Sequence, residues 1–337
     1  MPAATGYGHV ARRLERLMYS HIHSPFSPSR ALPRSVSRRP SSRFLVFILA
    51  FFGIIPFAAF ADVQLNGADG VSLTLNAPAT RVVTLAPDFA ELLYDVGAGG
   101  TLVGAIEYSD HPEAAKQIPR VGDGFHVDVE KILTLKPELV LAWQGGTPQA
   151  LIEKLRSLKL PVLVIGSHAL PDIASNLEIL GKATGHEVEA GKAAADFDAR
   201  LAALEQRYAH ASPIRVFYEI SPQPLFTVGG GQIISRVIQA CGGQNIFADL
   251  STLAPVVGME AVLARDPQAI VTGDGEGDVA SRFKLWQQWP QLSAVRYQNL
   301  FAVDDGSISS ATPRLLDAGR QVCDDLDKAR GNLAAKR

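Results

Sequence analysis

Two stretches of the chain, 130 residues apart, share one pattern of hydrophobic and polar positions. EKILTLKP at 130–137 and EAVLARDP at 260–267 each have glutamate first, leucine three positions later and proline seven positions later. An apolar stretch follows each copy, at 139–143 and at 269–272. Each copy predicts a short helix, a proline turn and a buried strand. The repeat indicates two homologous α/β lobes, and two facing lobes form a cleft suited to ligand capture.

Apolar stretches alternate with helical patterns on both sides of the chain's midpoint. Residues 63–75 predict a β-hairpin, and Asp88 is the expected N-cap of the first helix. In the first half, strands are predicted at 81–85, 102–106, 139–143 and 162–165, and helices at 89–96, 129–135 and 150–158. In the second half, strands are predicted at 215–220, 269–272 and 299–303, and a helix at 233–240. Such alternation is typical of a mostly parallel sheet.

Helix rather than loop is predicted between the two lobes. Residues 171–184 and 187–209 are rich in Ala, Leu, Glu and Lys, and the second segment would span about 34 Å. The predicted fold is therefore α/β, with two similar lobes of mostly parallel sheets joined by a long rigid helix. We divide the chain into a signal peptide with a long basic leader (1–61), an N-terminal lobe (62–168), bridging helices (169–210) and a C-terminal lobe (211–337).

The first 61 residues have the composition of an export signal. Residues 1–43 carry eight arginines and one acid, Glu15, and an apolar run at 44–60 ends in Ala59-Phe60-Ala61. A short apolar run with a small-x-small end predicts cleavage before Asp62. No cysteine stands at that position for a lipid anchor, so we expect the periplasm. Sec export is favoured over the twin-arginine route at Arg38-Arg39, and the true start codon stays open.

Charge and cysteine content narrow the possible partners. Residues 62–337 contain 24 basic and 33 acidic residues, a net charge of −9, which disfavours nucleic acid as a partner. Cys241 and Cys323 both lie in this part, and an exported pair most simply forms one disulfide. Two buried free thiols are the alternative.

The sequence offers little for catalysis. The five histidines after residue 61 lack the close spacing of a zinc site, and there is no Gly-x-Ser-x-Gly motif. Gly229, Gly230 and Gly231 precede a helix but lack the lysine and hydroxyl of a phosphate loop, so a tight turn is favoured. No enzyme, resident cofactor or metal site is predicted.

Aromatic residues and two glutamates are the candidate functional groups. Tyr108, Phe125, Trp143 and Phe226 fall at strand ends or in loops, where flat walls suit a large planar or macrocyclic ligand, although each is as readily explained as core. Glu130 and Glu260 begin the two matched helices, where the helix dipole alone favours an acid. Their matched placement also predicts a bipartite acidic surface that could dock a partner's arginines.

Five motifs occur in order along the chain: RVVTLAP at 81–87, YSDHP at 108–112, 130–143 with Gly145-Gly146, CGGQNIF at 241–247 and VLARDPQAIV at 262–271. Together they resemble the iron-chelate and corrinoid periplasmic binding protein family, and most closely its cobalamin-binding members. The resemblance implies two α/β lobes joined by one rigid helix. It also implies a disulfide at Cys241 and Cys323, and permease arginines that engage Glu130 and Glu260.

The same resemblance implies a corrinoid pocket with some departures. Tyr108, Trp143 and Phe226 match its aromatic positions, whereas two family tryptophans fall on Gly124, beside Phe125, and on Ala254. The family's acidic and basic residues in a late loop become Gly306 and Ser310, so this loop is expected to offer only small side chains and backbone. The residues of this loop are Gly306, Ser307, Ile308, Ser309 and Ser310.

The resemblance leads us to expect a monomeric substrate-binding protein that captures cobalamin and delivers it to an inner-membrane ABC permease and its ATPase. One alternative is haem or a ferric siderophore, with His126 or Tyr108 as an iron ligand. The other, of a different class, is an exported enzyme or scaffold on the same fold.

Overall fold

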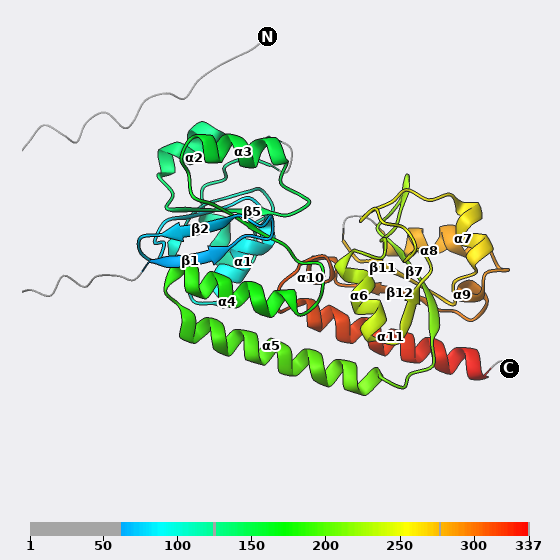
Figure 1. The fold of residues 1–337 in the computed structure, drawn as a ribbon. Coiled ribbons are helices and arrows are strands. Elements are labelled where there is room, and N and C mark those ends of the chain that lie inside the picture. Colours follow the sequence, from blue (N-terminus) through cyan, green and yellow to red (C-terminus); the bar gives the residue numbers. More distant parts are fainter. Residues whose placement is uncertain (1–61, 124–125, 276–277, 336–337) are drawn as a thin grey trace, which may run out of the picture. The chain divides into compact units, whose positions relative to one another are not determined.

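The computed structural model describes residues 62–123, 126–275 and 278–335. It contains two four-stranded parallel sheets that share the same strand order. In each sheet the second strand along the chain is an edge strand, and the first strand lies between it and the third. The N-terminal lobe is built on β4 (Leu102–Ala105), β3 (Val82–Thr84), β5 (Leu139–Trp143) and β6 (Val162–Ile165). The C-terminal lobe is built on β10 (Gly243–Asn245), β7 (Ile214–Glu219), β11 (Ala269–Gly273) and β12 (Leu300–Val303). The predicted pair of similar α/β lobes is confirmed (Figure 1).

Helices cover both faces of each sheet, which explains why the central strands are apolar on both sides. In the N-terminal lobe one face is covered by α2 (Val129–Leu135) and α3 (Gln149–Ser157), and the other by α1 (Pro87–Asp95) and α4 (Asp172–Thr184). In the C-terminal lobe the matching faces are covered by α7 (Met259–Arg265), α8 (Val279–Gln287) and α9 (Ser293–Arg296), and by α6 (Ile233–Ala240) and α11 (Leu315–Ala335).

The repeated sequence unit forms the same local structure twice. Helices α2 and α7 each end in a residue with left-handed backbone, Lys136 at φ 47° and Asp266 at φ 41°, directly before the proline. An arginine at the start of the neighbouring strand donates to carbonyls at each helix end. Arg81 bonds the carbonyls of Leu135 and Lys136, and Arg215 bonds that of Asp266 at 2.8 and 3.0 Å. These bonds satisfy carbonyls that a helix end leaves without partners.

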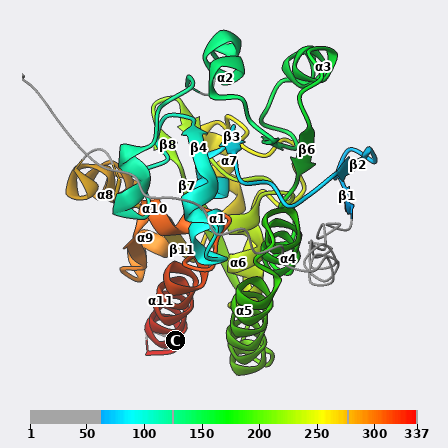
Figure 2. The ribbon, with the colours of Figure 1, turned by 90° about the vertical axis from the view of Figure 1, so that its left-hand side faces the viewer.

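Helix α5 (Glu187–Tyr208) connects the two lobes. Its 22 residues span about 33 Å, and its buried face carries Phe197, Leu201 and Leu204. It lies beside the C-terminal helix α11, where Arg200 pairs with Asp317 at 2.8 Å (Figures 1 and 2). The bridging helix was predicted, whereas α11 was not, although α11 buries Leu315, Val322 and Leu326 at lobe-core positions.

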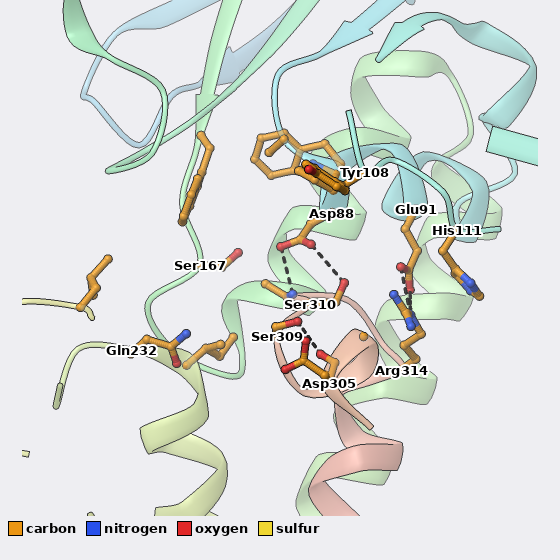
Figure 3. A pocket seen from close by; sticks show the side chains of 18 of the residues that line it. Asp88, Glu91, Tyr108, His111, Ser167, Gln232, Asp305, Ser309, Ser310 and Arg314 are labelled. Atoms are coloured by element: carbon orange, nitrogen blue, oxygen red, sulfur yellow. Dashed lines mark hydrogen bonds and ion pairs between the residues drawn. The ribbon is translucent and has the colours of Figure 1, made fainter. Parts of the chain in front are cut away.

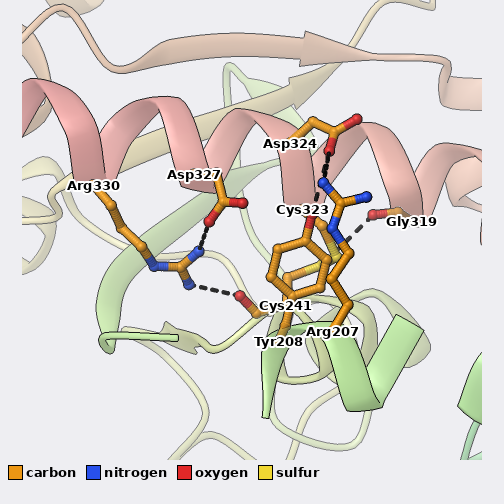
Figure 4. The surroundings of a disulfide bond; sticks show 8 residues. All are labelled: Arg207, Tyr208, Cys241, Gly319, Cys323, Asp324, Asp327 and Arg330. Carbon is orange, nitrogen blue, oxygen red and sulfur yellow. Dashed lines mark hydrogen bonds and ion pairs between the residues drawn. A yellow bond between two sulfur atoms is a disulfide. The ribbon is translucent and has the colours of Figure 1, made fainter. Parts of the chain in front are cut away.

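The predicted disulfide between Cys241 and Cys323 is present and fully buried. It joins the end of α6 to α11, across a sequence separation of 82 residues. Tyr208 of α5 donates its phenolic hydrogen to Asp324 at 3.2 Å beside the bridge, and Arg330 donates to the carbonyl of Cys241 at 2.6 Å (Figure 4). The bridge therefore lies where α5, α6 and α11 converge.

Two local predictions are settled by hydrogen bonds. Asp88 is not the N-cap of α1, because the helix begins at Pro87 with Ala86 as its N-cap, and the Asp88 carboxylate points toward the other lobe instead. The turn at Gly229 and Gly230 is confirmed as a structural turn, since their amides donate to the carbonyls of Leu253 and Leu250 and are unavailable to a phosphate.

The remaining elements are short. The predicted hairpin is confirmed as β1 (Val63–Asn66) and β2 (Ser72–Leu75), and a smaller one pairs β8 (Ser221–Pro222) with β9 (Leu225–Phe226). The others are η1 (Gly99–Thr101), η2 (Glu113–Gln117) and α10 (Asp305–Ile308). Among the described residues, no helix combines the length and apolar character needed to cross a membrane.

Removing the disulfide should destabilise the folded protein without changing its fold. We expect Cys241→Ser with Cys323→Ser to lower the free energy of unfolding by about 4 kcal/mol, because the closed loop restricts the unfolded chain. Urea unfolding of both proteins with and without dithiothreitol measures this. The wild type should lose stability in reductant and the double variant should not. Equal stability of the two proteins under oxidising conditions would contradict the prediction.

Candidate ligand-binding site

A cavity of about 790 Å³ lies at the carboxyl ends of the strands of both sheets. The N-terminal lobe contributes residues that follow β3, β4, β5 and β6, and the C-terminal lobe contributes the start of α6, residues 253–254 and the segment after β12. Figure 3 shows side chains of both lobes around this space. The carboxyl ends of parallel strands are the usual ligand-binding edge of α/β sheets, and the volume falls in the range of small-molecule sites.

Two aromatic side chains from the N-terminal lobe line the cavity. Tyr108 follows β4 and is 81% exposed, and Trp143 ends β5 and is 42% exposed. The Trp143 ring lies directly against Gly146, where a Cβ atom would be only 1.7 Å from the ring. Glycine at position 146 is therefore required for this ring position. Large aromatic surfaces that remain exposed in a cavity suit the burial of an apolar ligand face.

The C-terminal lobe supplies polar and apolar groups from three segments. Gln232 and Ile233 at the start of α6 lie near Leu253 and Ala254 in the lining, and Gly306, Ser309 and Ser310 come from the segment after β12. Ser307 and Ile308 are buried and do not line the cavity. Asp305 and Arg314 also line it, so this segment presents charged side chains at its two flanks that the sequence analysis missed.

Two carboxylates of α1 line the cavity and accept hydrogen bonds from the other lobe. Asp88 accepts hydrogen bonds from the Ser310 hydroxyl at 3.1 Å and the Ala311 amide at 3.0 Å. Glu91 accepts from Thr312 Oγ1 at 2.6 Å and from Arg314 Nε at 2.9 Å (Figure 3). Desolvation raises the pKa of Asp88, and the bonds from Ala311 and Ser310 oppose that rise. These contacts fix α1 of one lobe against the start of α11 in the other.

The cavity holds more acids than strong bases. Its acids are Asp88, Glu91, Asp110 and Asp305, and its strong bases are Lys116 and Arg314. Both bases already have acidic partners, Glu113 at 2.7 Å and Glu91 at 2.9 Å. Asp305 makes no ion pair within 4.0 Å in the described part of the chain, although the Arg282 charge opposes the rise that burial causes in its pKa.

Two histidines also line the cavity, His111 and His168. His168 Nε2 lies 2.9 Å from Gln144 Oε1, while Gln144 donates its amide to the carbonyl of Ala68. The Gln144 oxygen is therefore the acceptor, and His168 carries its proton on Nε2. No group of three or more His, Cys, Asp or Glu side chains suited to a metal ion occurs in the residues that the structure describes.

The other predicted site residues that the structure describes do not line the cavity. Phe226 is half-buried in β9, pairs with Val256 and is not part of the cavity wall. Phe125 falls outside the described residues, and the neighbouring His126 is exposed and does not line the cavity. Glu130 and Glu260 are exposed in the first turns of α2 and α7, one in each lobe, and neither lines the cavity.

Comparison with known proteins shows the family to which this chain belongs. Residues 82–306 match the family model described as "Periplasmic binding protein". The chain belongs to the periplasmic binding protein family. This family consists of solute-binding proteins and is not an enzyme family. The expected resemblance is thus confirmed.

Named relatives of this periplasmic binding protein share substantial sequence identity. It is 39% identical over 247 residues to the vitamin B12-binding protein of Vibrio cholerae serotype O1, covering 73% of this chain and 88% of the relative. It is 38% identical over 275 residues to the vitamin B12-binding protein of Yersinia pestis, covering 81% of this chain and 95% of the relative.

Solved structures agree on the fold. The crystal structure of the periplasmic vitamin B12 binding protein BtuF of Vibrio cholerae matches with a TM-score of 0.71 and 39% identity, covering 75% of this chain and 98% of that one. The periplasmic heme-binding protein RhuT from Roseiflexus sp. RS-1 matches with a TM-score of 0.66 at 23% identity, covering 74% and 98%. The second likeness concerns the fold alone.

Breaking the cross-lobe ion pair should destabilise the protein. Arg314→Met removes the cation from Glu91, which is only 4% exposed, so a buried carboxylate is left without its charge partner. We expect a loss of about 3 kcal/mol in the free energy of unfolding, measured in urea. Arg320→Met is the control, because its pair with Asp317 is 58% exposed on both sides and should contribute little. Equal effects of the two substitutions would contradict the prediction.

Proposed function

We propose that this protein captures cobalamin in the cavity between its lobes and delivers it to an ABC permease and its ATPase in the inner membrane. It acts as a monomer in the periplasm after removal of the 1–61 leader, which lies outside the described residues. Cobalamin is its cargo and not a cofactor, and no bond is made or broken. The main support is 38–39% identity to vitamin B12-binding proteins over most of the chain, together with the cavity.

The charge of the cavity favours cobalamin over haem. The periphery of cobalamin carries neutral primary amides, whose N–H groups need acceptors, whereas haem carries propionate carboxylates, which need cations. In this cavity Lys116 and Arg314 are already paired with acids, while the Asp305 carboxylate is available as an acceptor. A bound carboxylate would lie near Asp88 and Asp305, which make no ion pair with the described residues, so its desolvation would be poorly compensated.

The aromatic walls would supply most of the affinity. Tyr108 and Trp143 can cover the apolar faces and edges of a macrocycle, and their burial on binding would be favourable because both side chains are exposed. Gly306, Ser309 and Ser310 contribute backbone groups and small hydroxyls on the opposite wall. Phe125, Phe226, Ser307 and Ile308 stay predictions without support from the cavity lining.

Haem or a ferric siderophore is the second candidate. Members of the same fold bind haem, at 23% identity to this chain. Of the two iron ligands suggested by the sequence, Tyr108 lines the cavity and His126 does not. Tyr108 is thus the one group of that pair that supports this alternative.

Delivery would depend on Glu130 and Glu260. Both are exposed, each begins the repeated helix of its lobe, and both lie outside the cavity. Two carboxylates presented by rigid elements in equivalent positions suit recognition by arginines of a permease built from two similar halves.

A calorimetric titration of residues 62–337 with cyanocobalamin, hemin and a ferric siderophore tests the ligand. We expect tight one-to-one binding of cyanocobalamin alone. Tyr108→Ala and Trp143→Ala should each weaken it at least tenfold, about 1.4 kcal/mol, because aromatic contacts in cavities are strong anchors. Leu158→Ala is the control, since Leu158 is also 42% exposed but lies outside the cavity. Preferential binding of hemin or the siderophore would show that cobalamin is not the ligand.

Docking is tested separately with Glu130→Ala combined with Glu260→Ala. The double variant should bind cyanocobalamin like the wild type but bind the permease, reconstituted in nanodiscs, at least tenfold more weakly, because close charge pairs contribute about 1.5 kcal/mol or more. Glu178→Ala with Glu187→Ala removes two other exposed acids and is the matched control. Undiminished docking of the Glu130 and Glu260 variant would eliminate this assignment.

A further inference from the structure

The backbone at Tyr108 is strained in a way that depends on its surroundings. Tyr108 has φ 65°, in the left-handed region that a bulky side chain rarely adopts. Such a conformation is unfavourable for a tyrosine and persists only where neighbouring contacts impose it. Here it accompanies an aromatic side chain that is 81% exposed and lines the cavity. Something other than the tyrosine ring must therefore hold this loop.

Besides the backbone bonds from Glu107 to Gly122 and from Ser109 to Ile106, the guanidinium of Arg120 contacts the segment that follows Tyr108. It donates to the carbonyl of Ser109 at 2.9 Å, to the carboxylate of Asp110 at 2.7 Å and to the carbonyl of Ala115 at 3.1 Å. Ser109 and Asp110 are the two residues directly after Tyr108. Ser109 is itself 1% exposed, and its hydroxyl has no hydrogen-bond partner in the described structure. The Arg120 bonds therefore fix the chain at the two residues that directly follow Tyr108.

Arg120 is well placed to transmit rigidity from the sheet. Its backbone forms a parallel bridge with Ala105, the last residue of β4, and the flanking Pro119 and Val121 each bond Ala105. The Arg120 side chain is 18% exposed and is not part of the cavity lining. Its planar guanidinium donates to three acceptors at once, in Ser109, Asp110 and Ala115. A lysine ammonium group on its flexible chain would not reproduce this geometry.

We infer that Arg120 is a positioning residue that holds Tyr108 in its binding orientation before the ligand arrives. The inference rests on the proposed capture of a ligand in this cavity. A preformed wall avoids the entropy of ordering the loop during binding, so Arg120 raises affinity without touching the ligand.

The affinity test is a double-mutant cycle with cyanocobalamin. Arg120→Met should weaken binding about five- to tenfold in the wild type but less than twofold in a Tyr108→Ala background, since its effect passes through Tyr108. Arg156→Met is the matched control, because Arg156 is 25% exposed and holds a backbone carbonyl and an aspartate away from the cavity. Equal losses in both backgrounds would overturn the inference.

A second readout needs no ligand. Amide hydrogen exchange of peptides covering 106–115 should accelerate several-fold in Arg120→Met and remain at the wild-type rate in Arg156→Met. Unchanged exchange in Arg120→Met overturns the inference whether or not cyanocobalamin binds. Accelerated exchange in a protein whose wild type binds no cyanocobalamin supports the positioning role and rejects the proposed ligand instead.

Discussion

The contact between α1 and the start of α11 sets the relation between the two lobes. Glu91 is buried and Asp88 is half-buried, and a carboxylate withdrawn from water is tolerated only where donors surround it. Those donors, the Ala311 amide and the Arg314 guanidinium, belong to the other lobe. A large separation of the lobes would leave the charges without partners. The contact therefore opposes separation of the lobes at the cavity, which favours recognition by side chains in place beforehand.

Helix α11 also packs against the bridging helix. The bridging helix α5 packs beside α11, and the disulfide joins α11 to α6 close to the end of α5. The lobes are thus connected by helix α5, which packs against α11 of the C-terminal lobe, and by the Glu91–Arg314 ion pair and the Asp88 hydrogen bonds at the cavity. In such a frame, order in the Tyr108 loop would add to affinity without any movement of the lobes, and the hydrogen bonds of Arg120 to Ser109 and Asp110 supply that order.

Much of the fold could be predicted because hydrophobic period and proline turns are local signals. The repeat at 130–137 and 260–267 predicted α2 with β5 and α7 with β11, and the helix at 187–209 was placed within one residue of its end. Helix α11 was missed because its apolar positions are spaced among many charges. Asp88 was assigned as a local cap, since nothing in its neighbouring sequence reveals acceptors or donors more than 200 residues away.

The candidate site was predicted in outline only. Tyr108 and Trp143 are at the cavity because strand ends meet at one edge of a parallel sheet, whereas Phe226 follows a sheet strand but turns into a small hairpin beside Val256. The sequence by itself determined the two lobes, their parallel sheets, the bridging helix and the cysteine pair. Only the tertiary structure decided that Asp305 and Arg314 line the cavity, that Glu91 pairs with Arg314, and that Arg120 holds the Tyr108 loop. The physical reason is that period and turn chemistry act between near neighbours, while ion pairs and cavity walls join residues that only the folded chain brings together.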